Sequence, residues 1–543
     1  MKQIIRGGKV YDGTASEPFL ADIFLEDDRI AAVIPRDEAI PEGFKAAGFE
    51  DAEVTDITGL SIAPGFFDAH SHNDWFAIRK EPLKYFEPFI RQGITSFITG
   101  NCGLSATGFE PGTEHIGVVG AGLFGYSGSD ELTGTYPSVR EYLAAVDGHS
   151  PCNIAVLVGH CTARAGVKGN DSGALSEDEM KRMLQTMEKG LREGACGLSL
   201  GLMYKPGLFA PKEELRKVAE LCAKFDKPLT VHARALSKVS MDYPLFGRPH
   251  LLRALDELVE VTSGLKMKFQ YSHAIFVGRK SFKCKDELHA ILDRMREEGT
   301  DAMFDIYSEL LGVSVITVIM PTWYQALSHR QMHSWWNKLR LSVLCKATII
   351  LLGMDWSDIQ IAYLGPGGEK WEGKSVADCA REMGRSCVSA YLELCEMSNF
   401  NGRVNMGPYS TPEIIEWQSR RPDVLYMTDA WVEDHGVQNP AIYDCFPKFL
   451  RSSLLGKGDT LPATVRKMSG AVADRFGIRD RGYIRGGAFA DLTVFDEREL
   501  AQAIPDRERP FGIRKVWING RKVLDEGRLD EAALRTSGRA MKA

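Results

Sequence analysis

The sequence predicts an α/β protein: a (β/α)8 TIM barrel with a small β-sandwich domain built from both chain ends and an insertion between strands 7 and 8. Three observations predict it. Eight apolar, strand-like runs alternate with helical stretches in the middle of the chain, as in a parallel barrel. Both ends have the pattern of short strands. One interval between two of the eight runs is too long for a simple crossover.

The two ends of the chain have the pattern of β-hairpins. Near the start, QIIRGGKVYD places a Gly-Gly turn between apolar runs, and ADIFLEDDRIAAVI does the same with an Asp-Asp turn. Near the end, RGYIRGGAFADLTVF is followed by IRKVWINGRKVL, in which Asn519-Gly520 is the strongest hairpin signal of the chain. We therefore expect residues 1–62 and 478–543 to build one β domain together.

Residues 63–477 have the pattern of the barrel. The eight runs, in chain order, are SIAPGFFDAH, TSFITGNCG, NIAVLVGH, ACGLSL, PLTVHA, KFQYSHA, AMFDIY and VLYMTD. Helical stretches lie between most of them, and SEDEMKRMLQTMEKGLREG has a capping box at Ser176 and Glu179. The last two runs are separated by about 115 residues, so we expect residues 310–420 to fold as an insertion over the barrel mouth.

The composition argues against several classes of protein. Of the 543 residues, 44% are hydrophobic and 26% are charged, as in globular proteins. A net charge of −7 without a basic block argues against binding to nucleic acid. The longest apolar stretches, Leu310–Met320 and Ala347–Met354, are too short to span a bilayer, so no membrane is expected as a partner. The start lacks the apolar core of a signal peptide, and the eleven Cys then indicate reduced thiols in the cytoplasm.

Polar side chains of related chemistry follow several of the strand-like runs. Four are histidines, one is a cysteine and one is an aspartate, a set suited to Zn²⁺. They are His70, His72, Cys102, His232, His273 and Asp429. Taken singly, the cysteine is more readily explained as a buried thiol and a lone histidine as a structural residue. Because the carboxyl ends of barrel strands meet on one face, their joint occurrence predicts a metal site there.

These residues lie in motifs that resemble the D-aminoacylase (N-acyl-D-amino-acid deacylase) branch of the amidohydrolase superfamily. The resemblance runs from KVYDG to ADLTVFD. Its most specific piece is GNCGLS, where this branch has a cysteine in place of the carboxylated lysine of many relatives. PGFFDAHSHND, LVGHCTAR, GACGLSLGLMY, VHARA, YSHA and MTDA resemble the other strand ends. The resemblance implies a metal-dependent hydrolase that acts on carbon–nitrogen bonds other than peptide bonds.

The resemblance also implies how the site is divided. A tightly held zinc and a weaker second position would share the cysteine, which gives one or two Zn²⁺ per chain. The ligands would be Cys102, His232 and His273 for the first, and Cys102, His70, His72 and Asp429 for the second. Asp429 would also be the general base, which takes a proton from water and delivers it to the leaving nitrogen.

Five further residues are candidates for contact with substrate, and each has a structural alternative. A tyrosine near the end of strand four could donate to an oxyanion, whereas in the core it would only need a satisfied hydroxyl. An arginine two residues after His232 could point to the barrel mouth. A glutamate after strand seven could bind a cation, although such residues are usually solvated, and a histidine after strand three could belong to a structural network. The five are Tyr204, Arg234, Tyr307, Glu309 and His160.

The sequence departs from the family pattern where that family binds the substrate's carboxylate. Ile275 stands in place of a lysine after the strand-six histidine, and Ala441 in place of an arginine after the strand-eight aspartate. Losing both cations removes charge-assisted bonds of ~1.5–3 kcal/mol each.

We therefore expect a small-molecule amide other than a simple N-acyl-D-amino acid as the substrate. A cyclic amide (hydantoin or lactam) hydrolase or a deaminase on the same scaffold is the alternative. A catalytically silent binding protein is disfavoured because all six core positions are present. Whether the chain forms a homo-oligomer is left open.

Overall fold

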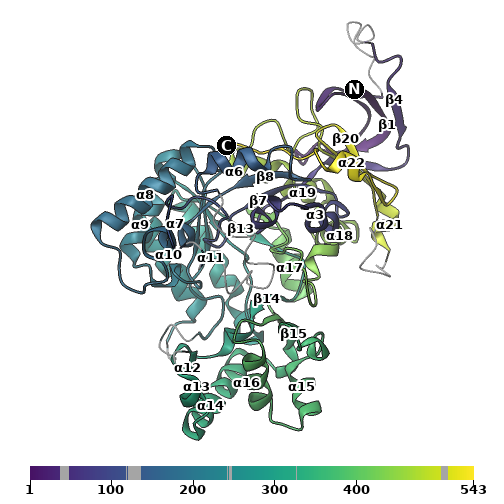
Figure 1. Ribbon diagram of the computed structural model, residues 1–543. Coiled ribbons are helices and arrows are strands. Elements are labelled where there is room, and N and C mark those ends of the chain that lie inside the picture. The colour runs from purple at the N-terminus through teal and green to yellow at the C-terminus, as the bar shows by residue number, and fades with distance from the viewer. Residues whose placement is uncertain are drawn as a thin grey trace.

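Parallel strands at the centre of the molecule form a barrel wrapped by helices (Figure 1). The computed structural model describes residues 1–543 except 37–47, 116, 118, 120–135, 241, 242, 244–246, 326 and 503–511. The barrel strands are β6 (Phe66–Asp68), β7 (Ile94–Thr99), β8 (Asn153–Val156) with β9 (Val158–Gly159), β10 (Leu198–Gly201), β11 (Leu229–His232), β12 (Lys268–Tyr271), β13 (Asp301–Ile306) and β17 (Val424–Tyr426). They occupy eight strand positions, because β8 and β9 are successive parts of one strand.

The pairing of these strands closes the ring. β6, β7 and β8 pair in parallel, and so do β9, β10, β11, β12, β13 and β17 in that order. The first and last strands meet through backbone bonds, in which the Ala69 amide donates to the Tyr426 carbonyl at 3.2 Å and the Asp429 amide to the His70 carbonyl at 3.1 Å. The predicted α/β barrel class is confirmed.

Helices cover the barrel. They are α2 (Asp74–Ala77), α3 (Leu83–Ile90), α6 (Val139–Val146), α7 (His160–Lys168), α8 (Glu177–Arg192), α9 (Lys212–Phe225), α10 (His250–Thr262), α11 (Lys285–Glu297), α17 (Pro412–Ser419), α18 (Ala441–Leu454), α19 (Leu461–Lys467) and α20 (Gly470–Phe476). Most of them have one face buried, whereas α2 and nearly all of α7 are buried on every side. In α8, Met180, Met183 and Met187 are buried at helical spacing. The predicted capping box of Ser176 and Glu179 begins this helix.

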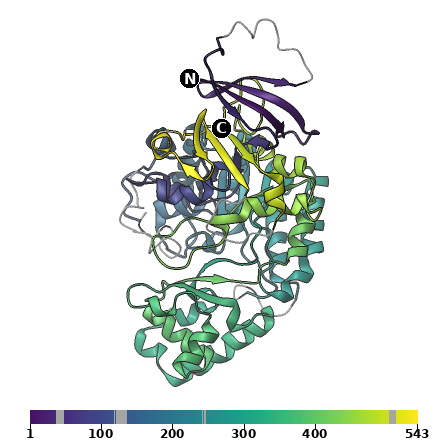
Figure 2. The ribbon, with the colours of Figure 1, turned by 90° about the vertical axis from the view of Figure 1, so that its right-hand side faces the viewer.

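Strands from both chain ends pair in one nine-stranded sheet above the barrel (Figure 2). They are β1 (Lys2–Val10), β2 (Phe19–Glu26), β3 (Arg29–Pro35), β4 (Glu53–Asp56), β5 (Ser61–Pro64), β18 (Leu492–Phe495), β19 (Ile513–Ile518), β20 (Arg521–Asp525) and β21 (Arg528–Leu529), with α21 (Glu497–Ala501) and α22 (Glu531–Leu534) beside them. β5 and β18 are antiparallel neighbours, so this pair joins the two ends. The predicted hairpin turn at Asn519 and Gly520 lies between β19 and β20, and both residues have a positive φ, as a tight hairpin turn requires. The predicted limits of the domains stay a prediction.

A separate lobe lies between β13 and β17. Its sheet consists of β14 (Gly312–Val315), β16 (Arg403–Met406) and β15 (Ile359–Tyr363), in that order and antiparallel. Its helices are α12 (Thr322–Gln325), α13 (His329–Met332), α14 (Trp335–Leu352), α15 (Val376–Met383) and α16 (Cys387–Met397). Figure 2 shows this lobe at the end of the molecule away from the terminal sheet. None of the helices among the described residues is long and apolar enough to cross a membrane.

Candidate metal centre

The barrel brings all six predicted metal ligands to the carboxyl ends of its strands. His70 and His72 follow β6, Cys102 follows β7, and His232 is the last residue of β11. His273 and Asp429 follow β12 and β17. The four imidazoles and the thiol are each exposed by 5% or less, so the ligands face one another in the interior.

Cys102 lies at the centre of this cluster. Its Sγ lies 3.3 Å from His70 Nε2, 3.4 Å from His232 Nδ1 and 3.5 Å from His273 Nε2. Asp429 Oδ1 completes the cluster, 3.5 Å from His70 Nε2 and 3.6 Å from His72 Nε2. Two overlapping groups could each hold an ion, namely His70 with Cys102 and His273, and His70 with His72 and Asp429.

The spacing of these atoms fits zinc. Zinc bonds of ~2.0–2.3 Å to nitrogen and sulfur in tetrahedral geometry separate neighbouring ligand atoms by about 3.4–3.6 Å. The separations around Cys102 Sγ are 3.3–3.5 Å. Burial raises the pKa of the Cys102 thiol to about 11, against the opposing effect of His70. A bound cation would therefore be needed to hold the thiolate at neutral pH, which is what a metal ligand of this type requires.

His232 and His273 have the protonation state that metal ligation needs. Burial lowers the pKa of His232 well below its usual value, and it lowers the pKa of His273 to about 4. Both imidazoles are therefore neutral at pH 7, with a lone pair available. At His70, burial alone would lower the pKa, but Cys102, Asp305 and Asp429 raise it well above its usual value, so a bound zinc would have to displace a proton there. Burial alone would raise the pKa of Asp429, but the neighbouring His70 and His72 lower it below its usual value, so its side chain is a carboxylate.

Three of the six predicted ligands have a backbone conformation that side chains rarely adopt. Cys102, His273 and Asp429 have φ values of 53°, 34° and 48°. Residues other than glycine in this left-handed region cost free energy and occur at functional sites, where the surrounding structure holds them. Two hydrogen bonds stabilise this conformation. The Asp429 amide donates to the His70 carbonyl at 3.1 Å, and the His273 amide donates to Asp305 Oδ1 at 2.6 Å.

Two buried carboxylates support the ligands, and sequence reasoning missed both. Asp305 on β13 lies with Oδ1 3.6 Å from His70 Nδ1, and its Oδ2 accepts a 2.9 Å bond from Gln270. Asp68 on β6 accepts bonds from the amides of His70 at 3.2 Å and Thr428 at 3.0 Å. The available signal was a single aspartate inside each of the otherwise apolar runs AMFDIY and PGFFDAH. Such partners orient a metal-binding histidine.

Three tyrosines lie beside the cluster. The Tyr204 ring packs against the His232 ring, with centroids 4.8 Å apart. Tyr307 and Tyr409 meet at Gly312, where an added Cβ would lie 3.1 Å from the Tyr307 hydroxyl and 2.8 Å from the Tyr409 ring. Burial raises the pKa of all three, and the charge of Asp429 raises it further. Tyr409, just before α17, was not predicted, because it follows β16 of the lobe and none of the eight predicted barrel strands.

The hydroxyls of these tyrosines are free to meet a substrate. None of the three forms a hydrogen bond with another described residue, yet none is among the buried polar groups that lack a partner. They therefore open onto space beside Asp429. Substrate binding by Tyr204 and Tyr307 stays a prediction, and Tyr409 is added to it.

The other three predicted substrate residues lie in ion pairs within the protein. His160 is fully buried, and its Nε2 lies 2.7 Å from Glu214 Oε1, which also accepts a 3.0 Å bond from Arg164. Arg234 Nε donates to Glu257 at 3.0 Å, and its Nη1 donates to the Leu208 carbonyl at 2.6 Å. The third residue, Glu309, pairs with Lys448 on α18. Contact of these three with substrate stays a prediction.

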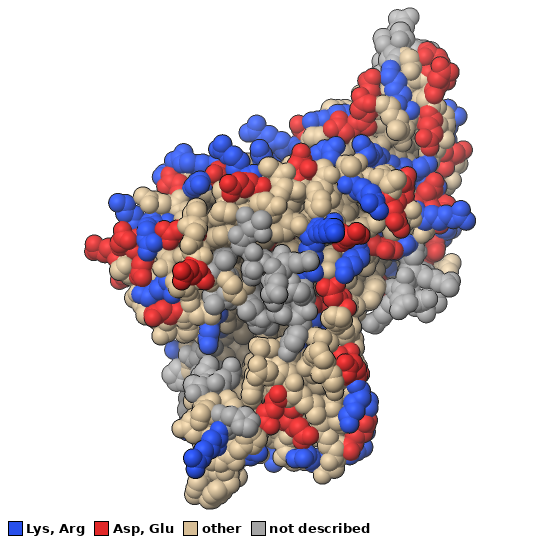
Figure 3. Space-filling view, viewed as in Figure 1, with Lys and Arg blue, Asp and Glu red and all other residues tan. Residues whose placement is uncertain are grey.

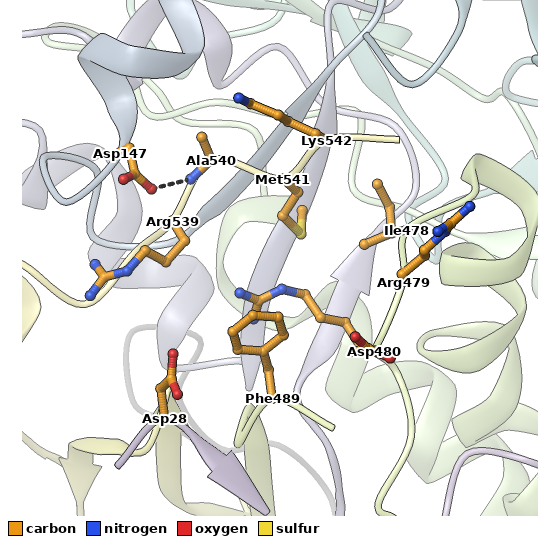
Figure 4. A pocket seen from close by; sticks show the side chains of 11 residues that line it. Asp28, Asp147, Ile478, Arg479, Asp480, Phe489, Arg539, Ala540, Met541 and Lys542 are labelled. Carbon is orange, nitrogen blue, oxygen red and sulfur yellow. Dashed lines mark hydrogen bonds between the residues drawn. The ribbon is translucent and has the colours of Figure 1, made fainter. Parts of the chain in front are cut away.

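A pocket of about 390 Å³ lies elsewhere, where the C-terminal tail passes the terminal sheet (Figure 4). Its lining includes Phe489, Met541 and Asp147, whose carboxylate accepts a bond from the Ala540 amide. It contains none of the predicted ligands or substrate residues.

Relatives of known sequence match the chain along nearly its whole length. It is 26% identical over 529 residues to the D-aminoacylase of Alcaligenes xylosoxydans xylosoxydans, covering 96% of this chain and 94% of the relative. It is 27% identical over 542 residues to the N-acyl-D-glutamate deacylase of the same organism, covering 96% and 93%. The predicted resemblance is thereby confirmed. No protein-family model matches the chain.

Solved structures share the fold. A D-aminoacylase structure superimposes with a TM-score of 0.77 at 24% identity, covering 100% of this chain and 99% of that one. The N-acyl-D-glutamate deacylase from Bordetella bronchiseptica, complexed with zinc and a phosphonate inhibitor, also superimposes with a TM-score of 0.77 at 24% identity, covering 100% of this chain and 99% of that one. The L-hydantoinase from Arthrobacter aurescens is 14% identical with a TM-score of 0.53, at 100% and 99% coverage.

Proposed function

We propose that the chain is a zinc-dependent amidohydrolase that hydrolyses a carbon–nitrogen amide bond, other than a peptide bond, of a small molecule. The observation that carries the proposal is the contact of one thiol with three imidazoles at 3.3–3.5 Å beside a carboxylate. This donor set is typical of zinc. The named activities of the full-length relatives, D-aminoacylase and N-acyl-D-glutamate deacylase, support the same class of reaction.

The proposed division of the ligands is the one that the resemblance to the D-aminoacylase branch implies. Cys102, His232 and His273 would hold one zinc, and His70, His72 and Asp429 would hold a second with the shared Cys102. The contacts of Cys102 Sγ with His232 and His273, and the grouping of His70, His72 and Asp429, support it. When bound, zinc lowers the pKa of water and polarises a carbonyl group. Asp429, a carboxylate at neutral pH, accepts the proton of the attacking water and delivers it to the leaving nitrogen. The hydroxyls of Tyr204, Tyr307 and Tyr409 donate to the substrate's oxygen atoms.

We further propose that the substrate presents a neutral group where the family that this chain resembles binds a carboxylate. Ile275 is apolar and buried at the first of the two expected anchor positions, and Ala441 is buried at the second. Among the described residues, three cations of the barrel rim are already paired: Arg164 with Glu214, Arg234 with Glu257 and Lys448 with Glu309. The tyrosine hydroxyls are neutral donors, which suit an amide or carbonyl oxygen.

The test compares two substrates that differ only in that group. Acetate release by the zinc-loaded enzyme is measured for N-acetyl-D-methionine and for the same compound with its carboxylate converted to an amide. We expect kcat/KM to favour the neutral compound by about tenfold or more, since burying an unpaired carboxylate costs at least one charge-assisted bond. A preference for the free acid would contradict the altered pocket but not the reaction class.

A further arm tests the reaction class itself. Hydantoin and dihydrouracil are offered to the same enzyme, with zinc per chain measured by elemental analysis. Turnover of the cyclic compounds alone would favour the cyclic-amide alternative. A zinc-loaded chain that hydrolyses neither linear nor cyclic amides would contradict the proposed function.

We also propose a cytoplasmic location. All eleven cysteines are free thiols, and ten of them are buried. Reduced thiols in this number are typical of proteins in a reducing compartment. Fractionation of the cells that make the protein would test this.

A further inference from the structure

Helix α14 of the lobe exposes an unusual amount of apolar surface. Of the thirteen exposed large apolar side chains among the described residues, six lie on this helix. Trp335 and Trp336 are both 64% exposed and stack on each other with ring centroids 3.9 Å apart. In Figure 1 the helix lies in the lobe, and its C-terminal end reaches the barrel, where Lys280 donates to the Ile350 carbonyl. The exposed apolar residues of α14 are not among the predicted ligands or substrate residues.

The exposed side chains form a stripe along one face of the helix. At 3.6 residues per turn, five of them fall within about 100° of its circumference, over a length of about 22 Å. They are Trp335, Trp336, Leu339, Val343 and Ile350. The opposite face, with Leu341, Cys345 and Ile349, is buried against the lobe. The stripe is thus an outer face that no described part of the chain covers, and we call it the α14 stripe.

The segment that carries the stripe has charge of one sign. No Asp or Glu occurs between Glu309 and Asp355, although the whole chain has a net charge of −7. Glu396 of the neighbouring α16 is paired with His333. The helix carries Lys338, Arg340 and Lys346, and all three are exposed. None of these three forms an ion pair with a described residue. Figure 3 shows uncharged surface and basic side chains at this end of the lobe.

Two partners could cover the α14 stripe: a second copy of the chain or an anionic surface. The exposed apolar side chains together with the three cations favour the anionic surface. A second copy of the chain would bring its own α14 against the first, and an antiparallel pair would place Arg340 of one helix near Lys346 of the other. Like charges at that distance repel, and neither helix has an acidic residue to offset them. An anionic surface instead complements the three cations while it buries the apolar side chains.

We propose that α14 docks the enzyme on the surface of a membrane that contains anionic lipid. Because the other face of α14 packs on the lobe, its exposed tryptophan and aliphatic side chains could enter the interface between headgroups and acyl chains, as the apolar face of a surface-bound helix does. Trp335 and Trp336 would enter the headgroup region, where tryptophan is favoured. The three cations would pair with lipid phosphates. The sequence expectation that no membrane is a partner rested on spanning length, which a surface helix does not need.

The first test measures binding of the full-length, zinc-loaded enzyme to vesicles by sedimentation. We expect binding to vesicles of phosphatidylcholine with added phosphatidylglycerol, little binding to phosphatidylcholine alone, and release by salt. The variant Lys338→Glu/Lys346→Glu is expected to bind more weakly by at least a factor on the order of 25, since each lost lysine costs about fivefold and each introduced glutamate repels the anionic lipid. The matched control is Lys181→Glu/Lys217→Glu, which reverses two exposed lysines on α8 and α9 and is expected to bind as the unaltered enzyme does.

The second test removes the apolar contact. Trp335→Ser/Trp336→Ser is expected to abolish binding to the anionic vesicles, whereas Leu455→Ser, at an exposed leucine elsewhere, leaves it unchanged. None of these residues is a predicted metal ligand or substrate contact. Unchanged zinc content and amide turnover therefore show that each variant is folded. The proposal is overturned if the unaltered enzyme stays in the supernatant, or if the α14 variants and their controls bind equally. A lipid-free dimer that the tryptophan variant dissolves would assign the stripe to a second copy instead.

Discussion

Two groups of polar side chains at the strand ends of the barrel differ in what holds them in place. The metal cluster is gathered around Cys102, and its ligand atoms face one another across the interior. The second group, which we call the rim pairs, consists of His160 and Arg164 with Glu214, Arg234 with Glu257, and Glu309 with Lys448. In the cluster, the shared partner is an ion that the chain has to acquire. In the rim pairs, each charge is already satisfied within the chain.

This difference predicts that the two groups fail in different ways. A lost ligand or base removes chemistry and leaves the fold, because the strands that present these residues are held by their own backbone bonds. A lost rim charge leaves a buried partner unpaired and lowers stability, while the zinc and its neighbours stay in place.

The largest effect is expected for Asp429→Asn. The amide cannot accept the proton from water, so kcat is expected to fall by ~10²–10⁴-fold. The zinc held by Cys102, His232 and His273 is expected to stay bound, because none of these three ligands is altered. Steady-state kinetics and elemental analysis of the same preparation check both values. Asp480→Asn, at an exposed aspartate, is the control, and unaltered turnover by Asp429→Asn would remove this residue from the mechanism.

The opposite pattern is expected for Glu214→Gln. His160 and Arg164 are fully buried and share this carboxylate, so removal of its charge is expected to lower the free energy of unfolding by about 3–5 kcal/mol. Turnover per zinc-loaded chain is expected to stay close to that of the unaltered enzyme. Denaturant unfolding and kinetics check the two expectations. Glu220→Gln on the same helix breaks an exposed pair with Arg216 and is expected to cost only about 0.3–0.5 kcal/mol.

If Glu214→Gln lost activity but unfolded with the same free energy as the unaltered enzyme, the distinction between the metal cluster and the rim pairs would be wrong for His160. This result would mean that His160 acts at the substrate, as the sequence suggested, and that its pairing with Glu214 serves that role.

A smaller effect is expected for Asp305→Asn, which lies behind the cluster. This carboxylate accepts the His273 amide at 2.6 Å and lies 3.6 Å from His70 Nδ1, so it orients two ligands without touching substrate. Zinc affinity or activity is expected to fall by ~10–100-fold. Zinc titration with a competing chelator measures the affinity. Asp301→Asn at the other end of the same strand, where Asp301 pairs with Arg475, is expected to leave zinc affinity unchanged.

The same comparison explains what could be predicted from the sequence. Each ligand stands directly after a recognisable strand, and the fold brings strand ends to one face, so position along the chain was enough to place Cys102 beside His273. The rim pairs could not be predicted, because the apolar periodicity of α10 and α18 shows which face is buried but not that Glu257 meets Arg234 or that Lys448 meets Glu309. Tyr409 was missed for a related reason: it reaches the cluster from a loop after the lobe.

Of the two rim-pair variants, Glu309→Gln is expected to show the smaller loss of stability. This variant also tests whether Glu309 is a purely structural partner of Lys448. Lys448 lies between Glu309 and Asp444, and Asp444 Oδ1 remains 3.0 Å from its amino group after the substitution. Because a second carboxylate keeps the lysine paired and the lysine is partly exposed, the loss of stability is expected to be only about 1 kcal/mol.

The substrate readout then decides which group Glu309 belongs to. Two amide substrates that differ by one amino group are compared in the unaltered enzyme and in Glu309→Gln. If Glu309 is satisfied by Lys448, kcat/KM for both compounds is expected to change by the same factor. A selective loss for the cationic compound would show that the carboxylate exchanges Lys448 for the substrate, and would place one rim pair within the binding site.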